Sequence, residues 1–246
     1  MGKSRLEGKV ALITGGARGM GAVHARTLQA EGAIVVITDV LDDEGAAVAK
    51  ELGITYLHHD VTDEKQWNSV ITETEKLHGP ISILINNAGV VGFTPVADTD
   101  LDEWNRVLAI NLTGPFLGIK TITPSMRKVG GGVIVNISST AGMIGYSNLS
   151  AYVSSKWGLR GLTKAAALDL AADNIRVVSV HPGGVRTPMT AGIDTPENYK
   201  RQPIKRIGEP EEIAKLVLYL VADATYSTGT EFIADGGATV GQVLNV

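Results

Sequence analysis

Short apolar runs alternate with longer segments of helical periodicity along almost the whole chain. The runs expected to form strands are residues 10–14, 34–38, 55–58, 81–86, 133–138, 176–180 and 231–234. The helical segments are residues 19–31, 43–52, 63–78, 101–128, 150–172 and 209–222. Several strands are apolar at consecutive positions, which is typical of parallel strands covered on both faces. The sequence therefore predicts an α/β fold, a doubly wound Rossmann-type parallel sheet with helices on both faces.

This alternation continues through 246 residues without a repeat, a low-complexity tract or a linker long enough to divide the chain. Because α/β folds of about 250 residues often form one domain, residues 1–246 are expected to be a single domain. The longest irregular stretch, residues 181–208, is rich in Pro, Gly and Thr. Loops of this length are uncommon unless they are functional, so we expect a substrate lid at residues 188–207.

Composition excludes several classes of protein. The formal charge of −4 argues against a nucleic-acid binder, which would normally carry a basic face. The absence of Cys excludes disulfides and Cys-ligated zinc, and the five scattered His form no metal-ligand spacing, so no metal is expected. No apolar run approaches the roughly 18 residues of a membrane span, and the N-terminal segment offers only residues 10–13 as an apolar stretch. We expect a soluble, cytoplasmic protein.

A glycine-rich loop follows the first expected strand and leads into a helix. Its sequence, Thr-Gly-Gly-Ala-Arg-Gly-Met-Gly, covers residues 14–21. Gly15, Gly19 and Gly21 allow a tight turn and a close approach of the backbone to a ligand. The helix that follows would direct free N–H groups and the positive end of its dipole at a phosphate. The alternative is a purely structural turn, but the strand–loop–helix context favours dinucleotide binding.

A carboxylate at the end of the second strand bears on the choice of dinucleotide. Asp39 lies 18 residues after Gly21, where it could accept hydrogen bonds from both ribose hydroxyls of NAD and repel the 2′-phosphate of NADP. The alternative role is a turn or helix-capping Asp. Arg18 opposes this preference, because a cation in the glycine loop could pair with a 2′-phosphate. Since a fixed carboxylate near a dianion costs more than one flexible Arg returns, NAD is favoured.

Candidate catalytic side chains lie in the second half of the chain. Ser138 and Ser139 end the fifth expected strand, and Tyr152 and Lys156 follow in a helical segment. Residues four apart lie within roughly 40° of each other on a helix. A phenol is a poor base at neutral pH, and a neighbouring ammonium would lower its pKa and make it a usable proton acceptor. Taken alone, a Tyr-x-x-x-Lys pair is common on helix surfaces.

Together these motifs resemble the short-chain dehydrogenase/reductase family over nearly the whole chain. The matching segments are the loop at 14–21, Asn-Asn-Ala-Gly at 86–89, Asn111 in Asn-Leu-Thr-Gly, Ser139 thirteen residues before Tyr152, Pro182-Gly183 with Val185 and Thr187, and Asp-Gly-Gly at 235–237. Within the family, the segments at 139–142, 155–158 and 181–183 are most similar to bacterial hydroxysteroid and secondary-alcohol dehydrogenases.

The resemblance implies a role for each catalytic residue. Tyr152 would exchange a proton with the substrate oxygen, and Ser139 would donate a hydrogen bond to that oxygen as charge develops on it. Lys156 would lower the pKa of Tyr152 and hold the nicotinamide ribose, and Asn111 would anchor a water that relays protons from Lys156 to solvent. The thirteen-residue spacing selects Ser139 over Ser138. His181 is interpreted as a structural residue at the end of a strand, and Trp157 as a core or subunit-contact residue.

The resemblance also implies a set of cofactor-binding residues and an assembly. The cofactor-binding set is Gly15, Arg18, Gly19, Met20, Gly21, Asp39, Asp60, Val61, Asn87, Ala88, Gly89, Tyr152, Lys156, Pro182, Gly183, Val185, Thr187 and Met189. For Asp60 a helix N-cap is an equally good reading. In this family the segments matching 101–128 and 150–172 pack across a two-fold axis, which implies a homotetramer.

Three segments are expected to line the substrate pocket: residues 90–93, residues 141–149 and the lid from Pro188. They offer Val91, Phe93, Met143, Ile144, Tyr146, Leu149 and Met189, and the first two segments contain no Arg or Lys. A mainly apolar pocket of this kind suits a hydrophobic ketone or secondary alcohol.

Several rival functions remain open beside this reading. One is a 3-oxoacyl thioester reductase acting on an acyl carrier protein, which would be expected to prefer NADPH and to present basic residues near the pocket. Another is a non-catalytic NAD-binding regulator. Enoyl reductases of related fold are disfavoured by the close spacing of Tyr152 and Lys156.

Overall fold

The computed structural model describes residues 4–192, 194–200 and 202–241. These residues form a seven-stranded, fully parallel sheet with the strand order β3-β2-β1-β4-β5-β6-β7. The strands are β1 (Val10–Thr14), β2 (Ile34–Asp39), β3 (Thr55–His58), β4 (Ile83–Asn86), β5 (Gly132–Ile137), β6 (Ile175–Pro182) and β7 (Glu231–Ala234). The predicted doubly wound Rossmann-type sheet is confirmed, because the chain winds outward from β1 to β3 and then in the opposite direction from β4 to β7.

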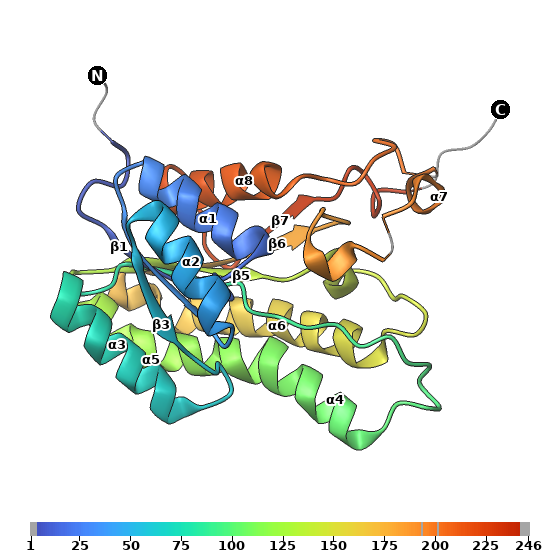
Figure 1. The fold of residues 1–246 in the computed structure, drawn as a ribbon, viewed down its shortest axis with the longest axis horizontal. Helices are drawn as coiled ribbons and strands as arrows, with labels where there is room; N and C mark the ends of the chain where they lie inside the picture. Colours follow the sequence, from blue (N-terminus) through green and yellow to red (C-terminus); the bar gives the residue numbers. More distant parts are fainter. Residues whose placement is uncertain (1–3, 193, 201, 242–246) are drawn as a thin grey trace.

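Helices cover both faces of the sheet. They are α1 (Gly19–Ala30), α2 (Asp42–Leu52), α3 (Glu64–His78), α4 (Leu101–Leu108), α5 (Gly114–Lys128), α6 (Ser150–Asp169), α7 (Pro196–Tyr199) and α8 (Pro210–Ala222). Helices α1, α2 and α8 lie on one face, and α3, α4, α5 and α6 lie on the other (Figure 1). In the described residues, no helix is both long and apolar enough to span a membrane.

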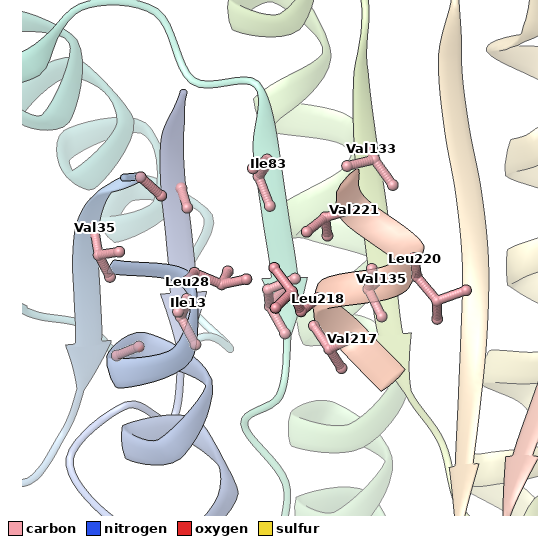
Figure 2. Close-up of a cluster of buried hydrophobic side chains, with 14 of the residues drawn as sticks. Ile13, Leu28, Val35, Ile83, Val133, Val135, Val217, Leu218, Leu220 and Val221 are labelled. Atoms are coloured by element: carbon pink, nitrogen blue, oxygen red, sulfur yellow. The ribbon is translucent and has the colours of Figure 1, made fainter. Parts of the chain in front are cut away.

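Two hydrophobic clusters, one on each face of the sheet, hold these layers together. Strand β1 contributes to both, with Ala11 and Ile13 in the cluster under α1 and α8 and Val10 and Leu12 in the cluster over α3 and α5. Figure 2 shows the first cluster, in which Ile13 and its neighbouring strand residues meet Leu28 and the side chains of α8. Burial on both faces explains why the strands are apolar at consecutive positions.

The segment expected to be one long helix at 101–128 is interrupted. Helix α4 passes into a π-helical turn over Ala109–Thr113 before α5 begins at Gly114. Such turns are frequent at functional sites, and this one contains Asn111. The helix starts predicted at Asp63 and Glu209 are confirmed: Asp63 accepts hydrogen bonds from the N–H groups of Lys65 and Gln66, and Glu209 forms a capping box ahead of Pro210.

The reversal of winding direction falls between β1 and β4, which are adjacent in the sheet. In sheets of this kind, ligands bind in the crevice beyond the carboxyl ends of the strands at that point. The loops that follow β1, β2, β4, β5 and β6 all leave from this edge, because every strand pair is parallel. The fold therefore gathers the glycine loop, Asp39, Asn87 and Ser139 at one edge of the sheet.

Candidate active site

The glycine loop turns tightly against the loop that follows β4. Gly15 has a φ of +65°, and a Cβ there would lie 2.8 Å from the Cα of Ala88. A Cβ at Gly21 would lie only 2.0 Å from the carbonyl oxygen of Gly15. Neither position accepts a side chain without opening the turn. The glycines therefore bring two loops and the start of α1 together.

Asn87 and Thr14 fasten these loops to each other. The Nδ2 of Asn87 donates to the carbonyl oxygens of Thr14 at 2.9 Å and Gly15 at 3.0 Å. The Oγ1 of Thr14 in turn accepts from the N–H groups of Asn87 and Ala88, both at 3.1 Å. The Oδ1 of Asn87 is buried and has no hydrogen-bond partner among the described residues. A buried acceptor without a partner is costly, so this atom is suited to a ligand donor in the crevice.

The N-terminus of α1 is left open toward this crevice. Arg18 is the N-cap residue but makes no capping hydrogen bond, and the first turn contains no acidic residue. The first N–H groups of a helix have no intrahelical acceptor, so Gly19, Met20 and Gly21 present their backbone donors to an anion. The side chain of Met20 packs against the core, so its contribution would come from the backbone.

Asp39 holds the glycine loop in place and lies at the end of β2, where a residue that binds the ribose is expected. Its carboxylate accepts from the N–H of Ala17 at 3.1 Å, which ties the glycine loop to the end of β2, and from Val40 and Leu41 at 2.8 and 3.2 Å. The first turn of α2, which follows directly, contains Asp42, Asp43 and Glu44. The surroundings of Asp39 are therefore acidic.

Arg18 already has an acidic partner in this region. Its guanidinium lies 3.7 Å from the carboxylate of Glu44. Both side chains are about half exposed, so the pair contributes little to stability. It nevertheless places a carboxylate beside the one cation of the glycine loop. This arrangement weakens the case for Arg18 as a partner of a 2′-phosphate.

Asp60 and Val61 follow β3 at the same edge of the sheet. The carboxylate of Asp60 accepts from the N–H and the hydroxyl of Thr62, at 2.9 and 2.8 Å. The N-cap of α3 is Asp63, so the alternative reading of Asp60 as that N-cap is wrong. Val61 is buried, and its carbonyl accepts from the indole N–H of Trp67 at 2.9 Å.

Ser139, Tyr152 and Lys156 meet where β5 runs into α6. Ser139 caps a short 3₁₀ turn at 140–142, and its Oγ accepts from the N–H of Ala141 at 3.1 Å. The buried Nζ of Lys156 donates to the carbonyl of Ile137 at 2.9 Å and lies 5.6 Å from the centre of the Tyr152 ring. Ser138 is buried and donates to the backbone of α6 instead. Ser139 is thus the hydroxyl that remains beside Tyr152.

The pKa of Tyr152 differs from the sequence expectation. Burial raises it, the hydroxyl of Ser139 opposes that rise, and Tyr146 adds to it. Lys156 is not among the groups that shift it, and burial lowers the pKa of Lys156 itself to about 8. In the protein alone, Tyr152 is therefore held as a neutral phenol, which is the form that donates a proton.

Asn111 uses its side chain to hold two neighbouring segments. Its Nδ2 donates to the carbonyl of Val90 at 2.8 Å and to the Oγ of Ser155 at 3.1 Å, and its Oδ1 accepts from the N–H of Val90 at 2.9 Å. A Cβ placed on Gly89 would lie 3.4 Å from this Oδ1 and 3.7 Å from the Nζ of Lys156. Asn111 and Lys156 therefore flank the same point on the Gly89 backbone, with Asn111 tying α6 to the loop after β4.

His181, interpreted from the sequence as a structural residue, contacts the backbone of Ser139, a partner that the sequence did not indicate. Its Nδ1 lies 3.0 Å from the carbonyl oxygen of Ser139 and its Nε2 lies 2.9 Å from the Oγ of Ser179. A carbonyl can only accept, so Nδ1 carries the proton and Nε2 accepts from the Ser179 hydroxyl. The side chain is fully buried, and burial lowers its pKa. His181 is therefore neutral and holds the backbone of Ser139.

The segment after β6 folds back toward the glycine loop. A Cβ on Gly183 would lie 2.8 Å from the Cα of Asp235, so this turn also requires glycine. Val185 is buried, and a Cβ on Gly19 would lie 3.5 Å from the side chain of Thr187. Thr187 forms a capping box with Thr190 ahead of Met189. Of the predicted residues in this segment, Thr187 is the one placed beside the glycine loop, whereas Pro182 and Gly183 lie at the end of β6 beside Asp235.

A cavity of about 1180 Å³ opens beside Ser139 and Tyr152. Val91, Phe93, Ile144, Tyr146, Leu149 and Met189 line it, as the sequence predicts, but Met143 is not among its lining residues. The remaining wall comes largely from the predicted lid and is polar, with Thr190, Asn198, Lys200, Gln202 and Lys205. The expectation of a mainly apolar pocket is wrong for this wall, because α7 and the irregular segments on either side of it bring polar side chains of the lid to the cavity.

The comparisons with known proteins agree with this geometry. The sequence profile described as "Enoyl-(Acyl carrier protein) reductase" matches residues 15–239. A solved structure described as a short-chain type dehydrogenase/reductase from Mycobacterium marinum superposes with a TM-score of 0.91 at 35% identity, over 96% of this chain and 97% of that chain.

Three curated relatives cover nearly the full length. Trans-4-hydroxycyclohexanecarboxylate dehydrogenase of Sinomonas cyclohexanicum is 46% identical, over 98% of this chain and 96% of its own. The 3-alpha-(or 20-beta)-hydroxysteroid dehydrogenase of Mycobacterium bovis is 47% identical, over 98% of this chain and 93% of its own. An NADP-dependent (R)-specific alcohol dehydrogenase of Lentilactobacillus kefiri is 40% identical, over 96% of this chain and 98% of its own.

Proposed function

The chain belongs to the short-chain dehydrogenase/reductase family, and its relatives are dehydrogenases of secondary alcohols. We propose that it is a NAD(H)-dependent dehydrogenase that interconverts a secondary alcohol with a hydrophobic body and the corresponding ketone. The observation that carries this proposal is the position of Ser139 and Tyr152 on the wall of a cavity, with Ser139 at the same edge of the sheet as the glycine loop. Activities in the relatives' names support a ring-bearing substrate.

Tyr152 acts as the general acid in ketone reduction and as the general base in alcohol oxidation. Ser139 donates a hydrogen bond to the substrate oxygen, and His181 holds Ser139 in place from its backbone side. When bound, the nicotinamide cofactor supplies or accepts the hydride. Lys156 holds the cofactor's nicotinamide ribose and, with Asn111, a water through which Tyr152 exchanges its proton with solvent. A nearby ammonium favours the phenolate once proton transfer has begun.

The cofactor fits the residues of the crevice. The open N-terminus of α1 would receive the pyrophosphate, and the unpartnered Oδ1 of Asn87 would accept from the nucleotide. Asp60, Val61, Ala88 and Gly89 would border the adenosine, while Val185, Thr187 and Met189 would fix the carboxamide. The acidic surroundings of Asp39 and the pairing of Arg18 with Glu44 support NAD over NADP.

One observation favours a second candidate function. The lid places Lys200 and Lys205 on the cavity wall, and a 3-oxoacyl thioester reductase acting on an acyl carrier protein would be expected to present basic residues near its pocket. The acidic site around Asp39 opposes it, since that reductase is expected to use NADPH. A non-catalytic regulator is disfavoured because Ser139, Tyr152 and Lys156 are all retained.

The proposal extends to the assembly and the location of the enzyme. We propose a homotetramer in the cytoplasm. Phe116 on α5 and Trp157 and Leu168 on α6 are exposed, which supports the packing of these helices across a two-fold axis. Residues 188–207 act as the substrate lid.

A panel of cyclic and aryl ketones and their alcohols, assayed with NADH, NADPH and their oxidised forms, tests the proposed activity. We expect turnover of cyclic ketones with a preference for NADH. Turnover of acyl thioesters alone, with NADPH, would support the second candidate instead. No change in cofactor absorbance with any substrate would contradict both.

A further inference from the structure

The charges on the wall of the substrate cavity all have one sign. Among the described residues that line it, Lys200 and Lys205 are the charged ones and no Asp or Glu contributes. The chain as a whole carries a formal charge of −4, so this wall differs from the average surface. A cleft lined by one sign of charge concentrates ligands of the opposite sign. The cavity is therefore suited to a substrate that carries an anionic group.

The two lysines are not equivalent. The ammonium of Lys200 pairs with the carboxylate of Glu197, one helical turn earlier on α7. Lys205 is exposed and forms no ion pair within the described residues. Its neighbour Arg206 is engaged with Glu212 at 2.7 Å and donates to the carbonyl of Ile207. Lys205 is thus the cation on this wall that remains available to a ligand.

The lysine and the apolar residues of the cavity come from different segments of the chain. Phe93, Ile144 and Leu149 come from the loops after β4 and β5, whereas Lys205 comes from the segment between α7 and α8. A substrate whose carbonyl carbon lies at Tyr152 could place a hydrophobic ring against the apolar residues. An anionic substituent on that ring could then reach the lid.

We propose that Lys205 binds a carboxylate on the substrate, so that the preferred substrates are hydroxy acids and keto acids with a hydrophobic ring. This inference rests on the proposed dehydrogenase function and specifies its substrate class. The carboxylate is not the reacting group: hydride and proton are exchanged at the carbinol carbon and oxygen, and Lys205 contributes binding and orientation only. It is a specificity-determining residue.

Matched substrate pairs provide the test. Keto acids of increasing distance between the ketone and the carboxylate, beginning with 4-oxocyclohexanecarboxylate, are each compared with the neutral primary amide of the same skeleton. In the wild type we expect at least one acid to exceed its amide in kcat/KM by threefold or more, with the excess shrinking as salt is added. An exposed ion pair is weakened in this way by screening.

Two variants and a control separate the possible results. Lys205→Met should remove the acid-to-amide excess by lowering kcat/KM for the acid, and Lys205→Arg should retain most of the excess. Lys215→Met removes an equal charge from an exposed position on α8 outside the cavity and should leave the ratio unchanged. An unchanged ratio in Lys205→Met, or an equal loss in Lys215→Met, would overturn the proposal.

The remaining results are also decisive. A rise in the KM for NADH in Lys205→Met, equal for acid and amide, would assign Lys205 to the cofactor and overturn the proposal. A wild type that prefers acyl carrier thioesters to every keto acid would assign the lid cations to a carrier protein. If the wild type reduces the amides without any preference for acids, the dehydrogenase function stands and only this inference fails. No turnover of any ketone would contradict the function itself and the inference with it.

Discussion

At the scale of single residues, the hydrogen bond from His181 to the backbone of Ser139 is the least expected feature of the site. The imidazole is buried between the Ser139 carbonyl and the Ser179 hydroxyl. We predict that His181→Leu lowers kcat for ketone reduction by about tenfold, equivalent to about 1.4 kcal/mol, because the Ser139 backbone loses its donor. His181→Asn, which keeps an amide donor, should recover most of the rate.

Steady-state kinetics with NADH titrations distinguish this role from general damage to the fold. A positioning role affects kcat and leaves the Kd for NADH unchanged. If His181→Leu weakened NADH binding as much as it lowered kcat, His181 would be only a structural residue of the core.

Lys156 gives the reaction a pH dependence that can be assigned. Burial lowers the pKa of its ammonium to about 8 and raises that of the Tyr152 phenol. The ammonium is present below this pKa, so ketone reduction should be level below about pH 8 and decline above it. In Lys156→Arg the guanidinium keeps its charge, and the decline should move well above pH 9. A pH–rate profile checks this, and a decline at the same pH in both proteins would assign it to another group.

The residue-level predictions from sequence succeeded where spacing along one element decided the geometry. Tyr152 and Lys156 share a helix face because they are four positions apart. The direction of the Tyr152 pKa shift was wrong, because it depends on burial by segments that are distant in sequence. Met143 is not among the residues that line the cavity, because one residue in a short loop can point to either side.

At the scale of secondary-structure elements, the end of β2 and the start of α2 form an acidic site at the expected ribose position. We predict that the wild type prefers NADH, and that Asp39→Asn narrows or reverses the preference. A like-charge pair at 4 Å costs about 4 kcal/mol at an effective dielectric of about 20, so loss of the carboxylate should shift the ratio of kcat/KM values by at least tenfold. Asn keeps the acceptor oxygen that the N–H groups of Val40 and Leu41 require.

Asp43→Asn is the matched control for this prediction. Asp43 lies in the first turn of α2 and is exposed, so its replacement removes the same charge from the same helix end. Values of kcat/KM for both cofactors in the three proteins decide the matter. An equal shift in Asp39→Asn and Asp43→Asn would indicate a general field effect without a direct ribose contact.

The elements themselves were mostly readable from sequence. Strand β1 and its glycine loop follow directly from four consecutive apolar residues and three spaced glycines. The π-helical turn at Asn111 could not be predicted from the sequence, because helical periodicity continues across it and no residue type in it indicates the extra residue of the turn. Helix α7 was missed because its four residues, Pro196–Tyr199, are too few to show a period.

At the scale of the whole molecule, two buried histidines predict a loss of stability in mild acid. Burial lowers the pKa of His24 to about 4, and neither of its ring nitrogens has a hydrogen-bond partner among the described residues. The pKa of His59 is also lowered to about 4, chiefly by burial. In the unfolded chain both would titrate near 6.5. The unfolded state therefore binds protons first as the pH falls, and stability is lost between pH 6.5 and 4.

We predict that His24→Met removes part of this dependence. At pH 4 the wild-type His24 costs about 3 kcal/mol of the free energy of unfolding, and Met has no proton to bind. Urea unfolding at several pH values between 7 and 4 should give a shallower slope for the variant. Identical slopes in the two proteins would show that His24 is not the titrating group.

The architecture as a whole could be predicted because burial on both faces of a parallel sheet imposes a recognisable pattern. Strands β1, β4 and β5 each contain three or four consecutive apolar residues for this reason. The character of the substrate cavity could not be predicted from the sequence. Its wall combines the loops after β4 and β5 with a lid that lies much further along the chain. Only the folded chain brings Lys205 into the same cavity as Phe93.

The central claim is that Tyr152 transfers the proton in a NAD(H)-dependent ketone reduction. Its most direct test is the kcat of Tyr152→Phe with NADH and the best ketone of the panel, together with the Kd for NADH. Loss of the proton donor should lower kcat by a factor of roughly 10²–10⁴, while NADH binding stays close to that of the wild type. A variant that keeps more than a tenth of the wild-type kcat would contradict the account.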